Sequence, residues 1–230
     1  GRRRGRVAGL SPRRPAPAGG GLRWSETERA LLAAHGPRLA AVDEVGRGPL
    51  AGPVVVCALV MPAGAPEVPG VDDSKRLAPA AREAAAARVR AAATAWALGA
   101  ASAREVDALN VYHATTLAMR RALAGLERRL GAAPDHVLVD GKPVRALGVP
   151  HTAVVGGDGR CYAVACASVV AKVARDRLMQ ALARRHPAYG WARNAGYGTA
   201  AHRAAIGAVG PTAHHRRSFL RLGMGPGRAE

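Results

Sequence analysis

The chain has 230 residues, enough for one well-cored domain or at most a small pair. It carries 34 basic residues against 16 acidic ones, which gives a formal net charge of +18 and an isoelectric point near 11.5. This balance favours anionic partners, nucleic acid first. The longest apolar runs are short and aromatics make up only 3% of the chain. These features argue against membrane association and against a signal peptide, so we expect a cytoplasmic protein.

The basic charge is not confined to one end of the chain. Residues 1–24 contain seven arginines and no acid, in a Pro- and Gly-rich context that cannot bury much apolar surface. We predict a disordered basic tail over 1–24, one folded domain over 25–220 and a flexible C-terminus over 221–230. Without the seven tail arginines the charge is still +11, from 18 minus 7, which predicts a basic face on the folded body.

The first half of the chain predicts a hairpin followed by a helix and a strand. Ser25 and Glu28 form a capping-box pattern that starts a helix, and Gly36 ends it. Two β-rich runs with a Gly-rich turn between them then predict an antiparallel pair. A Pro-started, Ala-rich helix and a third strand come next. The predicted ranges are 39–45 and 53–62 for the first two strands, 79–93 for the helix and 94–102 for the third strand.

The second half alternates helices with short strands. We predict helices over 110–130 and 161–185, and strands over 135–141 and 151–158 that each end at an acid. Together the elements predict an α/β domain with a mixed sheet flanked by helices. The three cysteines lie in apolar runs without metal-ligand spacing, which indicates buried thiols in a reducing compartment.

Several acids stand where a site would open. Asp43 and Glu44 end the first strand, Asp140 and Asp158 follow later strands, and Asp176 lies inside the last long helix. Adjacent strand residues face opposite sides of a sheet, so Asp43 and Glu44 can share one site only if the strand becomes irregular, as the following glycines would permit. Each acid alone is equally compatible with a solvated strand end or a surface ion pair. Gathered together, they would need a cation, and carboxylate oxygens select Mg²⁺ or Mn²⁺, as in two-metal phosphodiester hydrolysis.

Six ordered motifs in this chain resemble those of the type 2 ribonucleases H. They are "DEVGRGPLAGPVVV" at 43–56, "DDSKRL" at 72–77, "VDG" at 139–141, "ACASVVAKVARDR" at 165–177, "GYGTAAH" at 196–202 and "GPTAHHRRSF" at 210–219. The resemblance implies a ribonuclease H-like fold with a C-terminal helical extension. It also implies metal-dependent cleavage of the RNA strand of RNA/DNA hybrids and 5′ of single ribonucleotides in duplex DNA, leaving 5′-phosphate and 3′-hydroxyl ends. The implied catalytic and metal-binding carboxylates are Asp43, Glu44, Asp140 and Asp176.

The same resemblance implies a set of substrate contacts. Gly46, Arg47 and Gly48 correspond to the element that reads the ribose 2′-hydroxyl, where glycine would let backbone approach the sugar. Tyr197 corresponds to the tyrosine that packs on the deoxyribose after the junction, although it could instead cover its own turn. Ala195 occupies a position where a lysine is expected, which predicts one phosphate contact fewer and weaker substrate binding.

Lysine is rare in this chain, and its placement suggests function. Lys75 and Lys172 lie in the motifs, among 31 arginines, and could contact phosphate or orient a carboxylate. Lys172 and Asp176 stand four residues apart on one helical face, which also fits an ordinary ion pair. His202 could belong to a site or simply follow a capping Thr199.

Three functions remain open from the sequence. The carboxylates favour a metal-dependent endonuclease over a non-catalytic nucleic-acid-binding protein of the same fold. The Gly-Arg-Gly and Gly-Tyr-Gly elements disfavour a different polynucleotidyl transferase. We expect a monomer that binds RNA/DNA hybrids and ribonucleotide-containing DNA, and the sequence does not decide whether a replication clamp binds it.

Overall fold

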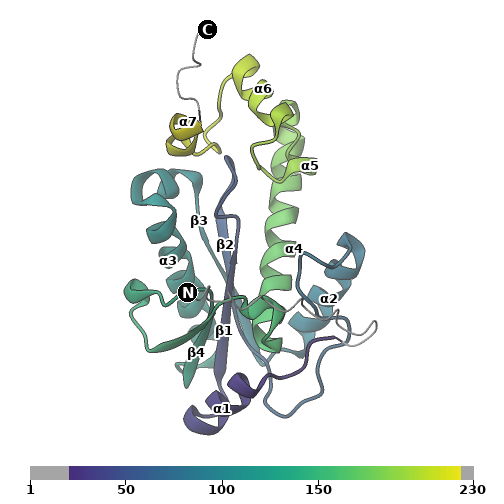
Figure 1. Ribbon diagram of the computed structural model, residues 1–230, viewed down its shortest axis with the longest axis vertical. Helices are drawn as coiled ribbons and strands as arrows, with labels where there is room; N and C mark the ends of the chain where they lie inside the picture. The colour runs from purple at the N-terminus through teal and green to yellow at the C-terminus, as the bar shows by residue number, and fades with distance from the viewer. Residues whose placement is uncertain (1–20, 224–230) are drawn as a thin grey trace, which may run out of the picture.

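The computed structural model describes residues 21–223 (Figure 1). Most of the predicted basic tail therefore lies outside the described residues. Its last part packs on the body: Leu22 donates a backbone hydrogen bond to Val71, and the Trp24 ring meets the Tyr162 ring edge-on at 5.2 Å. The ordered body therefore begins at least as early as Leu22 rather than at Ser25.

A five-stranded mixed sheet forms the centre of the molecule, as predicted. Its order is β3-β2-β1-β4-β5. The β1–β2 and β2–β3 pairs are antiparallel, and the β1–β4 and β4–β5 pairs are parallel. The continuous apolar run of β2 is buried over its whole length because helices cover both faces of the sheet. The strands are β1 (Leu39–Val45), β2 (Val54–Val60), β3 (Ala95–Ala101), β4 (His136–Asp140) and β5 (His151–Val154).

Helices form a layer on each face of the sheet (Figure 1). The helix α3 (Ala103–Leu130) packs on one face, while α4 (Tyr162–Arg185) and α2 (Pro79–Ala92) pack on the other. The predicted helix over 110–130 is present, but the prediction missed the segment before it, because Ser102 and Glu105 form a capping box that begins α3 at Ala103. The backbone of Asn110 is non-helical, with φ 64° and ψ 166°, and kinks the helix there.

Short helices extend the fold beyond the end of the sheet (Figure 1). They enclose a small apolar cluster of their own around Trp191, Tyr189 and Ile206. This is the predicted C-terminal helical extension. Its helices are α5 (Trp191–Asn194), α6 (Ala200–Val209) and α7 (Arg217–Gly223), and the 3-10 turn η3 (Pro187–Tyr189) precedes them. Two other 3-10 turns flank β5, namely η1 (Arg145–Leu147) and η2 (Gly157–Gly159).

The first helix, α1 (Glu26–His35), fastens the beginning of α4. Its predicted capping box between Ser25 and Glu28 is present. The fully buried Glu28 carboxylate also accepts hydrogen bonds from the backbone N–H groups of Tyr162 at 3.0 Å and Ala163 at 2.7 Å. A carboxylate at a helix N-terminus pairs with otherwise unsatisfied donors and with the helix dipole. The sequence pattern identified Glu28 as a cap of its own helix but not as a cap of α4.

Two further sequence predictions concern the core and the membrane. All three cysteines are buried and free of disulfides, as expected. Among the helices of residues 21–223, none combines the length and the apolar character that a membrane crossing requires.

Candidate active site

Asp43 and Asp140 lie side by side where β1 and β4 end, and we call this end of the two strands the edge of the sheet. The parallel register pairs Val42 of β1 with Val139 of β4, so the next residue of each strand is a carboxylate. Both strands present these side chains to the face covered by α4, because side chains alternate between faces. Asp43 is 5% exposed, and Asp140 Oδ1 accepts a hydrogen bond of 2.6 Å from the N–H of Gly157.

Glu44 faces the opposite side of the sheet. We expected the following glycines to disrupt β1 so that both adjacent acids could share one face, and this expectation is wrong. The strand stays paired with β2 through Val45, and Glu44 therefore points toward α3. One carboxylate oxygen, Oε1, lies 3.2 Å from Arg47 Nη1, while the buried Oε2 has no hydrogen-bond partner among the described residues.

The carboxylates at this edge perturb one another. Burial raises the pKa of Asp43 well above its usual range, and the charge of Glu44 raises it further. Burial also raises the pKa of Asp140, with Asp158 adding repulsion, and the charge of Asp140 acts on both Asp43 and Glu44. Like charges that resist ionisation together are a mark of functional sites.

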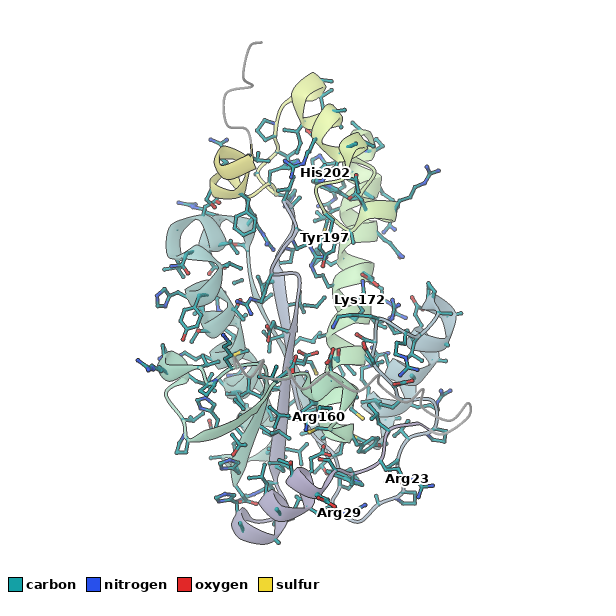
Figure 2. The ribbon with its side chains drawn as sticks, viewed as in Figure 1. Arg23, Arg29, Arg160, Lys172, Tyr197 and His202 are labelled. Carbon is teal, nitrogen blue, oxygen red and sulfur yellow. The ribbon has the colours of Figure 1, made fainter. Side chains whose placement is uncertain are left out.

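Asp176 approaches from α4 and is held by two cations. Lys172 Nζ lies 2.5 Å from one of its oxygens, and Arg82 Nη1 of α2 lies 3.2 Å from the other. Lys75 similarly places its Nζ 2.8 Å from Asp158. Each lysine therefore forms an ion pair with a carboxylate, a contact that fits both the orienting role and the ordinary ion pair that the sequence left open. Figure 2 shows Lys172 on α4, on the side that faces the sheet.

The carboxylates surround a common edge without forming a closed ligand cluster. Within the described part of the chain, no three Asp, Glu, His or Cys side chains are grouped so that they could hold a metal ion as they stand. Three carboxylates gather at the ends of β1 and β4, and Asp176 stands apart in its own ion pairs. Asp158, which the resemblance did not assign, joins the edge instead; its place after "VVGG" was the signal in the sequence.

The Gly46–Arg47–Gly48 turn follows β1 directly and is held from inside by two buried arginines. Arg175 and Arg216 are both 0% exposed. Arg216 donates to the carbonyl oxygens of Gly46 at 2.5 Å and Arg47 at 2.7 Å, and Arg175 donates to Pro53 at 3.0 Å. None of the ion pairs in residues 21–223 involves either arginine. Their donors are used on carbonyl groups, which fixes the turn with its carbonyls inward and leaves Arg47 and Gly48 exposed.

The two glycines of this turn are needed for different reasons. Gly46 has φ +91°, and a Cβ added there would collide with the Arg175 side chain and approach the Pro53 carbonyl oxygen to 2.8 Å. The groups that approach Gly46 closely are therefore protein groups, Arg175 and Pro53, and not the substrate sugar that the sequence led us to expect. Around Gly48 a Cβ would meet only Tyr197 Cε1, at 3.8 Å. Space for an approaching sugar exists at Gly48.

Tyr197 stands opposite this turn as an exposed side chain, 49% accessible to solvent. Its carbonyl oxygen lies 2.9 Å from Nδ1 of the buried His202 (Figure 2). The His202 N–H is capped by Thr199, so His202 takes the helix-start position that the sequence left as an alternative. Nearby Ala195 has φ 48°, and its carbonyl oxygen accepts a hydrogen bond of 2.9 Å from Arg175 Nη1.

A mixed sheet with carboxylates at the ends of β1 and β4, facing a long helix, defines a ribonuclease H-like nuclease. The sequence profile of the Ribonuclease HII family matches residues 40–222, and the chain belongs to the ribonuclease HII family. It is 52% identical over 202 residues to the ribonuclease HII of Paracoccus denitrificans, covering 86% of this chain and 93% of that one.

Two solved structures share the fold. One is the PCNA:RNase HII complex from Archaeoglobus fulgidus, with a TM-score of 0.63, 24% identity, and coverage of 78% of this chain and 93% of that one. The other is Bst-RNase HIII in complex with Mn²⁺, with a TM-score of 0.62, 20% identity, and coverage of 84% and 71%. At these identities the two structures support the fold alone.

Proposed function

We propose that the protein is an endonuclease that hydrolyses the RNA strand of RNA/DNA hybrids and cuts 5′ of single ribonucleotides in duplex DNA. The products would carry 5′-phosphate and 3′-hydroxyl ends. The observation that supports this most is the joint placement of the carboxylates and the Gly46–Gly48 turn at the end of one strand. A group that reads ribose therefore adjoins groups able to hold a cation, so recognition and cleavage can act on the same nucleotide.

The residues at the edge suit a hard divalent cation. Mutually repelling carboxylates and the partnerless Oε2 of Glu44 are features that a cation would relieve. Asp43, Glu44 and Asp140 would hold Mg²⁺ or Mn²⁺ at this edge together with Asp158, whose charge acts on both Asp43 and Asp140. Asp176, the fourth ligand that the resemblance implies, is instead held in ion pairs with Lys172 and Arg82. Bst-RNase HIII has been solved with Mn²⁺. When bound, the metal supplies Lewis-acid stabilisation of the attacking and leaving oxygens.

The remaining residues would position substrate and carboxylates. Lys172 and Arg82 hold the Asp176 carboxylate in place through ion pairs, and Lys75 does the same for Asp158. Exposed Arg47 lies next to Glu44 and can hold a substrate phosphate. Tyr197 offers a face to the deoxyribose that follows the ribonucleotide.

We assign the partners by the same reasoning. The excess of basic residues suits RNA/DNA hybrids and ribonucleotide-containing DNA, and Ala195 would leave the affinity lower than a lysine there. Action on such substrates in the cytoplasm, in DNA replication and repair, belongs to the proposal, as does a monomeric state. A ribonuclease HII of the same fold has been solved with PCNA, and contact with a replication clamp is the corresponding proposal here.

The proposal is tested with a labelled DNA duplex that carries one ribonucleotide. We expect cleavage 5′ of that nucleotide with Mg²⁺ or Mn²⁺, no cleavage in EDTA, and no cleavage of an all-DNA duplex. Product ends are mapped by phosphatase and ligase treatment. Metal-independent cutting, or equal cutting of all-DNA duplex, would contradict the proposal.

A further inference from the structure

We propose that a cavity beside Glu44 and Asp140 binds one nucleotide of the cleaved strand, on the 5′ side of the cut, with its ring system stacked on Tyr112. This inference rests on the proposed function and extends it to a second aromatic contact. The cavity has a volume of about 390 Å³ and lies between α3 and the ends of β1 and β4. Its lining includes the charged residues Glu44, Arg47, Asp140 and Lys142 and the aromatic Tyr112.

The lining of this cavity combines acidic, basic and aromatic side chains. Carboxylates from β1 and β4 lie on one side, and the exposed cations Arg47 and Lys142 belong to the same lining. A phosphate can pair with these cations while the attached sugar and base lie against an aromatic ring. A nucleotide presents this combination of an anion and a flat apolar surface.

Tyr112 is unusual among the aromatic residues of this chain. All eight lie in the described region, and only two are exposed, Tyr112 at 40% and Tyr197 at 49%. The other six are buried or partly buried. Exposed aromatic rings beside a basic groove are the platforms on which proteins stack nucleic-acid bases.

The backbone before Tyr112 is strained in a way that sets its position. Asn110 has φ 64°, a conformation that side chains other than glycine rarely adopt. Its Oδ1 accepts the N–H groups of Tyr112 at 2.9 Å and His113 at 3.2 Å, so Asn110 restarts the helix and Tyr112 falls in the new first turn. Strain of this kind costs on the order of 1–3 kcal/mol and tends to persist where function requires the geometry.

The positions of the two exposed tyrosines indicate in which direction the cleaved nucleic-acid strand runs across the site. Tyr197 lies next to Gly48, whereas Tyr112 shares its cavity with Arg47 and Glu44. A nucleic-acid strand whose scissile phosphate lies over the carboxylates must continue on both the 5′ and the 3′ side of the cut. Since Tyr197 is proposed to hold the nucleotide after the ribonucleotide, Tyr112 is left to the nucleotide on the 5′ side.

The test removes the aromatic ring of Tyr112 and measures the effect on the KM for substrate and on base stacking. Tyr112→Ala should raise the KM for the single-ribonucleotide duplex by about tenfold, while Tyr112→Phe should stay near the wild-type value, because stacking on one base is lost in the first and kept in the second. The kcat should change little in either. Leu109→Ala, at an equally exposed helix position outside the cavity, is the matched control.

A fluorescent base locates the contact. With 2-aminopurine immediately 5′ of the cut and EDTA present to prevent turnover, binding should quench the fluorescence in wild type and in Tyr112→Phe but not in Tyr112→Ala. Quenching only from the complementary strand, or an unchanged KM in Tyr112→Ala, would overturn the inference while wild-type cleavage still supports the function. Failure of the wild type to cleave at the ribonucleotide would instead overturn the proposed function.

Discussion

The proposed function requires carboxylates at positions where burial makes their ionised form unfavourable. Asp43 is buried beside Glu44, Asp140 and Asp158, so its pKa is raised well above the ordinary value of 3.8. A carboxyl with a raised pKa in the folded protein stabilises the fold only below its unfolded pKa, and that stability is lost as the pH rises through the folded value. Without metal, stability should therefore fall as the pH rises through the folded pKa of Asp43.

Asp43→Asn should show this directly. We expect the metal-free variant to melt about 2–4 °C higher than wild type at pH 7, because a buried like charge is removed at constant shape. Mg²⁺ should raise the Tm of wild type more than that of the variant. Differential scanning fluorimetry in EDTA and in Mg²⁺ measures both, with Glu83→Gln, at an exposed ion pair on α2, as a control. A variant that melts lower than wild type in EDTA would contradict the account.

The two glycines of the turn should fail differently when a methyl group is added. Gly46→Ala is expected to cost about 1–3 kcal/mol or more of stability, since the methyl collides with Arg175 and the φ of +91° is unfavourable. Gly48→Ala should fold with a change within about 0.5 kcal/mol, yet lose discrimination between ribose and deoxyribose. Urea unfolding and cleavage of matched duplexes separate the two effects.

Gly207→Ala on α6 is the control, because a Cβ there meets nothing within 4 Å. The account of the turn is wrong if Gly48→Ala reads ribose normally, or if Gly46→Ala is as stable as wild type.

At the scale of whole elements, the C-terminal extension is tied together by a histidine pair. Trp191 Nε1 donates to His202 Nε2 at 2.9 Å, and His215 Nε2 lies 3.1 Å from the same nitrogen. Thr212 N–H donates to His215 Nδ1, so His215 carries its proton on Nε2 and His202 carries its proton on Nδ1, facing the Tyr197 carbonyl. The chain of hydrogen bonds requires both imidazoles to be neutral.

This pair predicts a loss of stability in mild acid. Burial lowers the pKa of His215 to about 4 from an ordinary value of 6.5. A lowered pKa contributes stability that is present above the unfolded value and is lost as the pH falls from 6.5 toward 4. We expect the free energy of unfolding, measured in urea, to fall by about 1–3 kcal/mol between pH 7 and 4.5. The dependence should be shallower in His215→Gln and unchanged in the exposed His113→Gln; equal slopes in all three proteins would contradict the prediction.

The elements that could be predicted are those with local signals. The apolar β1 and β2 runs, the capping box at Ser25 and the long apolar α4 each encode their own structure, and all were found. The early start of α3 was missed although Ser102 and Glu105 repeat the capping-box pattern, because Asn110 interrupts the helix behind it.

The site was predictable in its residue types but not in its internal contacts. Motif resemblance pointed to Asp43, Glu44, Asp140 and Asp176. Strand order places the first three at the ends of β1 and β4, whereas Asp176 lies apart in its own ion pairs. The arginines behind the turn were missed because an arginine that bonds to carbonyl groups far along the chain leaves no local pattern: Arg216 reaches Gly46 across 170 positions. For the same reason we expected a substrate sugar next to Gly46, where the structure has the Arg175 side chain.

At the scale of the whole molecule, binding and cleavage should be separable. The net charge of +18 is distributed over many arginines, so affinity for a nucleic-acid duplex should depend on salt and hardly on any one carboxylate. Cleavage, in contrast, should depend on the carboxylates where β1 and β4 end. We propose that the carboxylates at this edge, and not the basic surface, perform the hydrolysis.

Asp140→Asn tests that claim most directly, in single-turnover cleavage and equilibrium binding of the same RNA/DNA hybrid. The account predicts that cleavage with Mg²⁺ or Mn²⁺ falls by roughly three orders of magnitude or more. Hybrid affinity should stay within about threefold of wild type and keep the same salt dependence. Cleavage near the wild-type rate in a folded Asp140→Asn protein would contradict the assignment of the active site to this edge.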